Sequence, residues 1–329
     1  MPVETDLIGI GAPVVDLLAH VDEDFVAEIE GGKGGMELVG ADGLEALVEK
    51  LAAEPAQAAG GSAGNTVFAA GKLGTRVGFL GKLGNCDAAA FYRKRFEEIG
   101  ADLSRFKTGE VPNAKCLSLV TPDSERTMRT DLGAAMTMAL EEVTESDFKG
   151  VRHLHIEGYL LFNRDLMKHI LDLAKESGCT TSLDMASFEV VKAAEDILDG
   201  WLKDHVDIVF ANEDEAAAFF PDHDDHKKMA ASFNGVCDIA AVKLGKDGSL
   251  IAHGGDVEFV EPIIVDKAID TTGAGDYWAG GFLHGWLDGK PLTTCGRYGS
   301  IMGAEVVQVL GASLSEERWE ALAGNLDSH

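Results

Sequence analysis

A glycine-rich segment late in the chain, DTTGAGD at residues 270–276, combines hydroxyls, glycines and a carboxylate in a pattern that suits chemistry on a phosphate group. The residues after it, 277–286, are apolar or glycine apart from one histidine, and they predict a buried helix. The free N–H groups of a helix start bind anions, and Gly273 and Gly275 let a ligand approach the backbone closely. Asp276 would repel an anion, so its place indicates contact with a second group, such as a hydroxyl about to attack the phosphate. A glycine-rich loop with an N-capping Asp276 is the alternative.

A second segment, GGSAGN at residues 60–65, offers groups that suit a sugar. Gly60 and Gly61 provide a hinge or a close approach to the backbone, and Asn65 supplies both a donor and an acceptor for adjacent hydroxyls. The alternative is an ordinary loop followed by an Asn in the first helical turn. Asp16 lies in the apolar run of the first expected strand, where a carboxylate is costly unless it meets a partner. A ligand hydroxyl and a buried ion pair are equally good candidates for that partner.

Asn212 and Glu215 stand three residues apart, where an expected strand, VDIVFAN, runs straight into a helix start. This spacing places both side chains on the same side of the first helical turn. Acidic residues at a helix start are ordinary capping chemistry. Carboxylate and amide oxygens also suit Mg²⁺, which usually keeps most of its waters. The pair therefore predicts either a helix cap or a water-mediated magnesium site.

The composition limits the class of protein and of partner. The chain has 329 residues, 46% of them hydrophobic, which is ordinary for a soluble protein with a substantial core. A net charge of −28 argues against nucleic acid or an anionic membrane as a partner. The five cysteines are odd in number and lack a C-x-x-C pair, so neither structural zinc nor a disulfide framework is expected. The start lacks a basic n-region and no apolar run reaches membrane length, which predicts a reduced, cytoplasmic environment.

Strand-like apolar runs alternate with helical patterns over most of the chain. Residues 151–161 precede a helical pattern whose apolar positions share one face. Those positions are Leu166, Ile170, Leu171 and Ala174. Strands separated by helices predict a parallel sheet that is covered on both faces. Residues 237–255 predict two further strands around a Lys-Asp-Gly turn.

Two segments do not follow this alternation of strands and helices. Residues 14–40 and 112–133 are strand-like but lack intervening helices, and the second reads as a hairpin with a Pro-Asp-Ser turn. We expect them to form a small β-sheet lid that is separate from the main sheet. The glycine-rich motif GGKGGM at residues 31–36 fails the P-loop pattern, because no Lys-Ser/Thr pair follows it.

Taken in order, the Gly-Gly and Asn motif, the N-x-x-E motif and the D-T-T-G-A-G-D motif resemble those of the PfkB, or ribokinase-like, family of sugar and nucleoside kinases. The resemblance spans nearly the whole chain, from the first strand to about Ser315. It implies a single α/β domain over residues 1–329, a ribokinase-like three-layer αβα sandwich with a mainly parallel central sheet and a small β-sheet lid. It also implies an ATP-dependent phosphotransferase with an alcohol group as acceptor.

The resemblance implies roles in phosphoryl transfer for the residues that match. Asp276 is the expected general base, which takes the proton from a primary hydroxyl. The backbone amides of Gly273, Ala274, Gly275 and Asp276 are expected to form an anion hole around the γ-phosphate. Arg126 matches a lid arginine that steadies the phosphates.

Other matching positions belong to the substrate and cofactor sites of the family. The residues expected to bind the acceptor are Asp16, Gly60, Gly61 and Asn65. The residues expected beside ATP are Asn212, Glu215, Lys243, Gly245 and Gly248, with Glu215 reaching Mg²⁺ through water. Many relatives use a monovalent cation, and potassium is expected behind the anion hole on Asp270, Thr272, Val306, Gly311 and Ser315. The chain departs from the family in one loop, where Cys86 replaces an expected Asp and Ala89 an expected Gly, so substrate contacts from this loop are an open question.

Two segments bear on the identity of the phosphate acceptor. Residues 156–161 and 183–191 resemble the bacterial adenosine-kinase-like branch, whereas sugar kinases of the family more often carry Asn-Pro or Asp-Pro after the corresponding strand. Tyr159 suits stacking on a purine, although a core tyrosine is the commoner explanation of such a residue. The expected acceptor is the 5′-hydroxyl of adenosine, with ribose, fructose or a related sugar as the alternative.

Two other classes of protein fit the motifs less well. A non-catalytic nucleoside-binding protein would be expected to lose some of the Asp276, anion-hole and N-x-x-E groups, which are all intact here. A dinucleotide-binding dehydrogenase needs a third glycine that GIGAPVVD, at residues 9–16, lacks. The expected partners are therefore a small-molecule acceptor and ATP, bound by a monomer or a homodimer.

Overall fold

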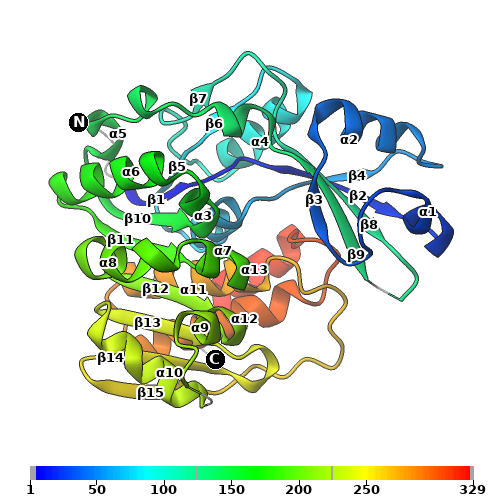
Figure 1. The fold of residues 1–329 in the computed structure, drawn as a ribbon. Coiled ribbons are helices and arrows are strands. Elements are labelled where there is room, and N and C mark those ends of the chain that lie inside the picture. The colour runs from blue at the N-terminus through cyan, green and yellow to red at the C-terminus, as the bar shows by residue number, and fades with distance from the viewer. Residues whose placement is uncertain (1–4, 124, 224, 327–329) are drawn as a thin grey trace.

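An eight-stranded sheet runs through the middle of the computed structural model, which describes residues 5–123, 125–223 and 225–326 (Figure 1). The strand order is β15-β14-β13-β12-β11-β10-β1-β5. The parallel strands are β1 (Thr5–Ile10), β5 (Val77–Leu80), β10 (Val151–Glu157), β11 (Thr180–Asp184), β12 (Ile208–Asn212) and β13 (Ile239–Lys243). The antiparallel strands are β14 (Ser249–His253) and β15 (Asp256–Val260). The mainly parallel sheet predicted from the sequence is confirmed, as are the two strands around the Lys-Asp-Gly turn.

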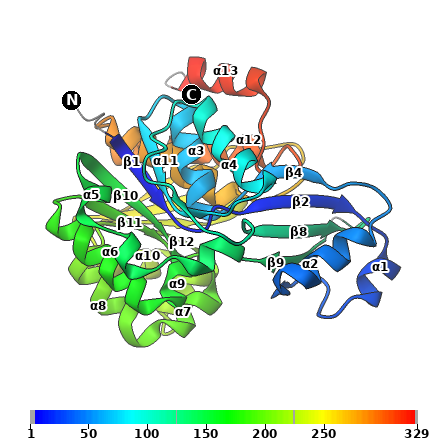
Figure 2. The same ribbon diagram turned by 90° about the horizontal axis from the view of Figure 1, so that it is seen from above.

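Helices cover both faces of this sheet, so the main body has three layers (Figure 2). One face carries α3 (Ser62–Lys72), α4 (Asp87–Glu98), α11 (Ala274–Leu287), α12 (Leu292–Val306) and α13 (Glu316–Asn325). The other face carries α5 (Glu145–Phe148), α6 (Arg164–Glu176), α7 (Phe188–Ala193), α8 (Glu195–His205), α9 (Glu213–Phe219) and α10 (His226–Ser232). The predicted αβα sandwich is confirmed. Among the described residues, no helix has both the length and the apolar character needed to cross a membrane.

Helix α6 forms because its capping residue and its apolar face act together. The N-cap Asn163 accepts a hydrogen bond from the Leu166 amide at 3.3 Å, which satisfies one free N–H of the helix start. The apolar face that packs on the sheet consists of Leu166, Met167, Ile170, Leu171 and Ala174. Burial of each large aliphatic side chain contributes about 1.5–3 kcal/mol. The helical face predicted from the spacing is therefore the face that holds α6 in place.

A second, five-stranded sheet projects from one side of the main body (Figure 1). Its strands, in the order β3-β9-β8-β2-β4, are β3 (Met36–Leu38), β9 (Arg126–Asp131), β8 (Lys115–Val120), β2 (Val15–His20) and β4 (Ala56–Ala59). Two helices pack with it, α1 (Glu23–Glu28) and α2 (Gly40–Glu49). We call these five strands and two helices the lid. A further pair of short strands, β6 (Lys82–Leu83) and β7 (Lys107–Thr108), lies outside both sheets.

Three features of the lid differ from the expectations. The segment 14–40 does contain a helix, α1, which is capped by Asp22 through a hydrogen bond from the Phe25 amide at 2.8 Å. Strand β4 was not expected, because its sequence, AQAA, lacks the β-branched and aromatic residues that are typical of strands. Asp16 lies on β2 in the lid and not in the first strand of the main sheet.

Two close crossings of the chain join the lid to the main body. One runs from β1 through Ala12 to β2, and the other runs from β4 through Gly61 to α3. Gly61 has φ +82°, and a side chain there would meet the carbonyl oxygen of Ala12. Glycine is therefore required at this crossing both for its backbone conformation and for lack of space.

The carboxyl edge of the main sheet gathers polar residues. The last residues of four neighbouring strands, β10 to β13, are Glu157, Asp184, Asn212 and Lys243. The register pairs Glu157 with Asp184 and Asn212 with Lys243. In open α/β sheets, ligands bind outside the carboxyl ends of the strands. The topology therefore places these side chains where a ligand is expected.

Candidate active site

The Asp276 carboxylate lies between the first turns of two helices. Asp276 belongs to the first turn of α11, and Ser62 and Asn65 belong to the first turn of α3. The Ser62 hydroxyl donates to Asp276 Oδ1 at 2.9 Å, and Asn65 Nδ2 donates to Asp276 Oδ2 at 3.0 Å. Asn65 was expected on substrate hydroxyls, and here it orients the expected base. Ser62 was not among the site residues expected from the sequence. Its position, directly after a Gly pair and at the start of an expected helix, could have identified it.

The two helices come this close because glycine replaces a side chain between them. A Cβ at Gly280 of α11 would lie 2.6 Å from the Thr66 carbonyl oxygen of α3. At the N-cap of α11, Gly273 has φ +73°, and a Cβ there would lie 2.7 Å from the Cβ of Ala312. Of the amides expected to form the anion hole, that of Ala274 donates to the Thr271 carbonyl at 3.1 Å. The amides of Gly275 and Asp276 remain in the first turn, where helical N–H groups lack an intrahelical acceptor.

The electrostatic surroundings of Asp276 suit a general base. Burial and the neighbouring Asp184 carboxylate raise the pKa of Asp276 to about 6, while the hydrogen bonds from Asn65 and Ser62 lower it. A carboxyl group with this pKa is mostly ionised at neutral pH and is a stronger base than an ordinary aspartate.

Lys243 provides an ammonium ion next to the helix start. Its Nζ lies 2.9 Å from Asp184 Oδ2, and a Cβ on Gly275 would lie 3.0 Å from the same Nζ. Burial lowers the pKa of Lys243, but Asp184 and Glu215 raise it above its ordinary value. Burial raises the pKa of Asp184, but Lys243, together with the hydrogen bond from the Ala186 amide and with His155, lowers it below its ordinary value. The pair is therefore ionised, with its positive end against the anion-binding turn.

Asp184 is a site residue that the sequence analysis did not identify. Its Oδ1 accepts a hydrogen bond from the Ala186 amide at 2.9 Å. Ala186 has φ +64° and is the only non-glycine residue with a positive φ among the described residues. Such backbone strain is typical of functional sites, where the surrounding structure maintains it. A single carboxylate at the end of an apolar strand leaves no pattern that sequence reasoning could detect.

Asn212 and Glu215 form a reciprocal cap at the start of α9. The Asn212 amide donates to Glu215 Oε2, Asn212 Nδ2 donates to Glu215 Oε1, and the Glu215 amide donates to Asn212 Oδ1, each at 2.8 Å. Burial and the Asp184 carboxylate raise the pKa of Glu215 to about 7. The capping alternative from the sequence is thus realised. Capping uses one lone pair on each Glu215 oxygen, so the carboxylate still fits a role in holding a magnesium-bound water.

Within the described residues, no group of three or more His, Cys, Asp or Glu side chains forms a metal cage. The carboxylates of Asp184 and Glu215 nevertheless line one pocket beside Lys243. Mg²⁺ usually binds through one or two carboxylates, substrate phosphates and several waters. The donor set therefore fits a magnesium ion that arrives with phosphates.

These side chains surround a pocket of about 390 Å³ at the carboxyl edge of the sheet. Its lining residues are Ser62, Tyr159, Asp184, Ala186, Asn212, Glu213, Glu215, Lys243, Gly245, Gly275 and Asp276. The pocket thus brings together expected residues of the N-x-x-E motif, of the turn after β13 and of the D-T-T-G-A-G-D motif. The residues expected to bind the acceptor, Asp16, Gly60, Gly61 and Asn65, do not line it. Tyr159 lies in the short 3-10 helix Gly158–Phe162 and is 43% exposed, so it is not a core tyrosine. Gly248 does not line the pocket and closes the turn after β13, where the Leu244 amide donates to its carbonyl at 2.9 Å.

Asp16 faces the site from the lid. The side chain is partly buried, and in the described part of the chain it has no ion-pair or hydrogen-bond partner. A Cβ on Gly60 would meet the Asp16 carboxylate, so this glycine makes room for it. Burial raises the pKa of Asp16 to about 7, with Arg126 lowering it and Asp276 raising it further. The buried ion pair considered from the sequence is not what the structure contains.

Glu157 is a second site residue that the sequence analysis did not identify. Its Oε1 accepts a hydrogen bond from the Ala12 amide at 2.8 Å, which ties the crossing after β1 to the end of β10. Burial raises the pKa of Glu157 to about 7, against the hydrogen bonds from the Ala12 and Ala63 amides.

The loop that departs from the family lies beside a different cavity. Cys86 Sγ accepts a hydrogen bond from the Asn113 amide at 3.3 Å, and Asn113 Oδ1 accepts one from the Gly84 amide at 3.0 Å. Cys86 lines a cavity of about 570 Å³ together with Leu17 and other lid residues. The loop is therefore bound to the start of β8 and not to the Asp276 pocket.

The residues expected to bind a monovalent cation are already hydrogen-bonded. Asp270 Oδ1 accepts from the Thr272 amide at 3.0 Å, and Asp270 Oδ2 accepts from the Gly311 amide at 2.7 Å. Arg126, expected on the phosphates, instead lies 3.1 Å from both oxygens of Asp270 through Nη1. The carbonyls of Val306, Gly311 and Ser315 accept from the amides of Val309, Ser313 and Trp319 at 3.2, 2.9 and 3.1 Å. Each of these carbonyl oxygens keeps a second lone pair, so the hydrogen bonds alone do not exclude a cation. What opposes an additional cation here is the Arg126 guanidinium, which already lies against the one carboxylate of the set.

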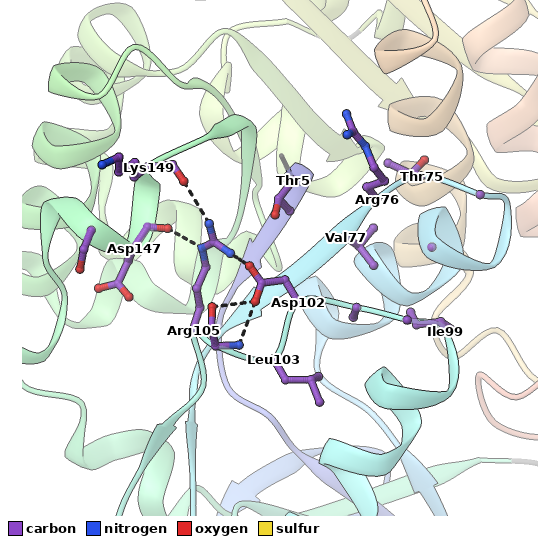
Figure 3. A pocket seen from close by; sticks show the side chains of 16 residues that line it. Thr5, Thr75, Arg76, Val77, Ile99, Asp102, Leu103, Arg105, Asp147 and Lys149 are labelled. Atoms are coloured by element: carbon purple, nitrogen blue, oxygen red, sulfur yellow. Dashed lines mark hydrogen bonds and ion pairs between the residues drawn. The ribbon is translucent and has the colours of Figure 1, made fainter. Parts of the chain in front are cut away.

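A larger cavity, of about 820 Å³, opens at the amino ends of β1 and β5 (Figure 3). Arg105, its central charged residue, pairs with Asp102 and donates to the backbone carbonyls of Asp147 at 2.7 Å and Lys149 at 3.2 Å. The positive charge of Arg105 is therefore neutralised by Asp102 and by backbone carbonyls of the protein itself. The cavity lies at the opposite edge of the sheet from Asp276, so it does not belong to the same site.

Comparisons with known proteins point to kinases. A family model described as pfkB family carbohydrate kinase matches residues 36–319. The chain is 29% identical over 249 residues to the ATP-dependent ribose-1-phosphate kinase of Halopiger xanaduensis, covering 75% of this chain and 80% of the relative. It is 29% identical in sequence to the solved structure of adenosine kinase from Sinorhizobium meliloti, with a TM-score of 0.87. A probable sugar kinase from Rhizobium etli has a TM-score of 0.88 and 27% identity, and both structures match over 98% of this chain and 99% of their own.

Proposed function

Since the chain belongs to the pfkB family of carbohydrate kinases, we propose that it transfers the γ-phosphoryl group of ATP to the 5′-hydroxyl of adenosine. The observation that carries the proposal is the place of Asp276, whose carboxylate is held by Ser62 and Asn65 beside the Lys243 ammonium. One pocket thus contains a base for a hydroxyl and positive groups for a phosphate.

The reaction requires the movement of one proton. The acceptor hydroxyl gives its proton to Asp276 while its oxygen forms a bond to the γ-phosphorus, and the bond from that phosphorus to the bridging oxygen of ADP breaks. Ser62 and Asn65 hold the two carboxylate oxygens, so that the base does not have to reorient during the step. The pKa of about 6 keeps Asp276 ionised at neutral pH.

The phosphates would meet fixed positive groups in this pocket. The first-turn amides of α11 and the ammonium of Lys243 face the same space, and both stabilise negative charge that develops on a phosphoryl group. Kinases of this family use ATP and Mg²⁺. Asp184 and Glu215 are the residues that would hold the Mg²⁺ through water, and the ion would neutralise charge between the phosphates and these carboxylates.

The acceptor is proposed to be uncharged. Asp276 is mostly ionised at neutral pH, and a sugar phosphate would bring up to about two further negative charges toward it. Asp16 and Glu157, with pKa values raised to about 7, would add to this repulsion in their ionised fraction. A nucleoside or a free sugar brings none. This favours adenosine over ribose 1-phosphate, the substrate in the name of the related kinase from Halopiger xanaduensis.

Tyr159 and the structural similarity to an adenosine kinase support a nucleoside. The exposed ring of Tyr159 at the pocket offers an aromatic face to a purine. A free sugar such as ribose or fructose is the second candidate, because the Asp16 carboxylate suits the hydroxyls of either ring. The similarity to a probable sugar kinase favours this second candidate.

A panel of acceptors tests the proposal. The purified protein is incubated with ATP, Mg²⁺ and, separately, adenosine, other nucleosides, ribose, fructose and ribose 1-phosphate, and the products are identified by mass. We expect adenosine to have the highest kcat/KM and to yield AMP. Preference for a sugar would overturn the choice of adenosine, preference for ribose 1-phosphate would overturn the uncharged acceptor, and absence of any phosphorylated product would overturn the kinase itself.

A further inference from the structure

Arg126 and Asp270 form an ion pair between the lid and the main body. Arg126 is the first residue of β9 in the lid, and Asp270 lies three residues before Gly273, the N-cap of α11. Arg126 Nη1 lies 3.1 Å from both carboxylate oxygens. The two side chains are only 14% and 5% exposed, so the pair is shielded from solvent. Charge pairs that are shielded in this way are screened much less by salt than surface pairs.

The Asp270 carboxylate has four hydrogen bonds in this arrangement. Oδ1 accepts from Arg126 and the Thr272 amide, and Oδ2 accepts from Arg126 and the Gly311 amide. Burial alone would raise the pKa of Asp270, but the Thr272 and Gly311 donors and Arg126 lower it below its ordinary value. A carboxylate has about four lone-pair sites, so its accepting capacity is used.

The position of this carboxylate links it to the anion-binding turn. Asp270 holds the Thr272 amide, and the chain then turns through Gly273 into the first turn of α11. The Gly311 amide fixes the opposite loop, and a Cβ on Gly311 would lie 3.1 Å from Leu18 Cδ1 of the lid. Any charge that sits on Asp270 therefore orders the turn that presents the amides to the phosphoryl group.

The resemblance to related kinases assigned Asp270 to a monovalent cation. The structure places the guanidinium of a lid residue, Arg126, against both oxygens of that carboxylate. A free cation and a guanidinium on the same carboxylate repel each other, so the two partners exclude one another.

We infer that Arg126 supplies at Asp270 the positive charge that a free monovalent cation would otherwise supply, so that this kinase works without potassium. Arg126 is then a positioning residue, which acts through Asp270 on the turn before α11. Because Arg126 belongs to the lid, the turn before α11 is ordered by Asp270 and Arg126 only while the lid is closed over the main body. The inference rests on the proposed function for its kinetic consequence, but the ion pair itself does not depend on that function.

The first experiment measures adenosine phosphorylation in KCl, NaCl and N-methylglucamine chloride at constant ionic strength. The wild type is expected to have the same kcat/KM in all three salts. Arg126→Met keeps much of the side-chain volume and removes the charge. Without potassium its kcat should fall by about 10²-fold, which is the loss expected when the groups that hold the phosphoryl group are misplaced. Potassium should restore much of this loss, because the vacated carboxylate can accept a cation. A matched control is Lys33→Met, which breaks lid ion pairs with Glu23 and Asp123 far from Asp270 in the sequence and should show no potassium response.

A second readout needs no activity. The unfolding temperature of Arg126→Met should rise selectively in KCl relative to NaCl, since an ion that binds only the folded state stabilises it, whereas that of the wild type should not. Activation of the wild type by potassium, or an Arg126→Met variant that responds to no cation in either measurement, would overturn the inference. If the wild type phosphorylates no acceptor, the proposed function fails, and the unfolding temperatures alone decide the inference.

Discussion

Lys243 reaches across a strand to pair with Asp184. The two residues end β13 and β11, with β12 between them, and Lys243 Nζ lies 2.9 Å from Asp184 Oδ2. The ammonium is thereby held at the edge of the sheet, below Gly275 in the first turn of α11. A compact positive charge fixed at this point suits a phosphate that binds the helix start.

The Lys243–Asp184 pair predicts a phosphate-binding defect. Lys243→Met should lower kcat by about 10²-fold and raise the KM for ATP, because the variant loses a preorganised charge and leaves Asp184 unpaired. Steady-state kinetics with ATP varied at saturating acceptor measure both effects. Lys246→Met in the following turn is the matched control, since Lys246 is exposed and does not line the pocket. Equal kinetics for the two variants would remove Lys243 from the phosphate site.

The pKa of Asp276 predicts the acidic limb of the pH profile. The base must be ionised, so kcat should fall as the pH drops through about 6. Ser62→Ala removes a hydrogen bond that lowers the pKa of Asp276, and its acidic limb should therefore move to higher pH. Measurement of kcat between pH 5 and pH 8, with constant ionic strength, checks both statements. A limb that stays in place or moves to lower pH in Ser62→Ala would contradict the assignment of the limb to Asp276.

The fold and the centre of the site could be predicted because their signals are local. Alternating apolar runs and helical faces identified the parallel sheet and α6, and the D-T-T-G-A-G-D motif identified Asp276. Asp184 and Glu157 were missed, because each is one carboxylate at a strand end whose importance comes from residues distant in sequence. Strand β4 was missed because pairing with β2, and not residue propensity, makes AQAA a strand. The Arg126–Asp270 pair joins residues 144 positions apart, so only the folded chain brings them together.

Asp16 should affect the acceptor and not ATP. Asp16→Asn should raise the KM for adenosine by about tenfold, as for loss of a charged hydrogen-bond acceptor, while the KM for ATP stays nearly unchanged. Kinetics with each substrate varied in turn separate the two constants. Asp24→Asn, an exposed acidic residue of α1 in the same lid, is the matched control. A change confined to the KM for ATP would show that Asp16 acts on ATP and not on the acceptor.

The lid should become protected when the acceptor binds. Strands of a small sheet depend on their neighbours for stability, and a bound acceptor would add contacts from Asp16 to the Arg126–Asp270 pair that already joins the lid to the main body. We expect saturating adenosine to slow hydrogen exchange of amides in residues 14–40 and 112–133, and also in β4, which pairs with β2. Amides of α8, on the far face of the main sheet, serve as the internal control. Unchanged exchange throughout the lid would mean that it does not respond to the acceptor.

The turnover of Asp276→Asn with adenosine and ATP shows whether this carboxylate is the general base. Asn keeps the shape of the side chain but cannot take the proton of the attacking hydroxyl. We predict that kcat falls by at least about 10²-fold while the Kd for ATP changes by less than about threefold. Asp288→Asn, an exposed residue at the other end of α11, should behave as the wild type. Near-normal turnover by Asp276→Asn would mean that the carboxylate held between α3 and α11 has no part in the reaction.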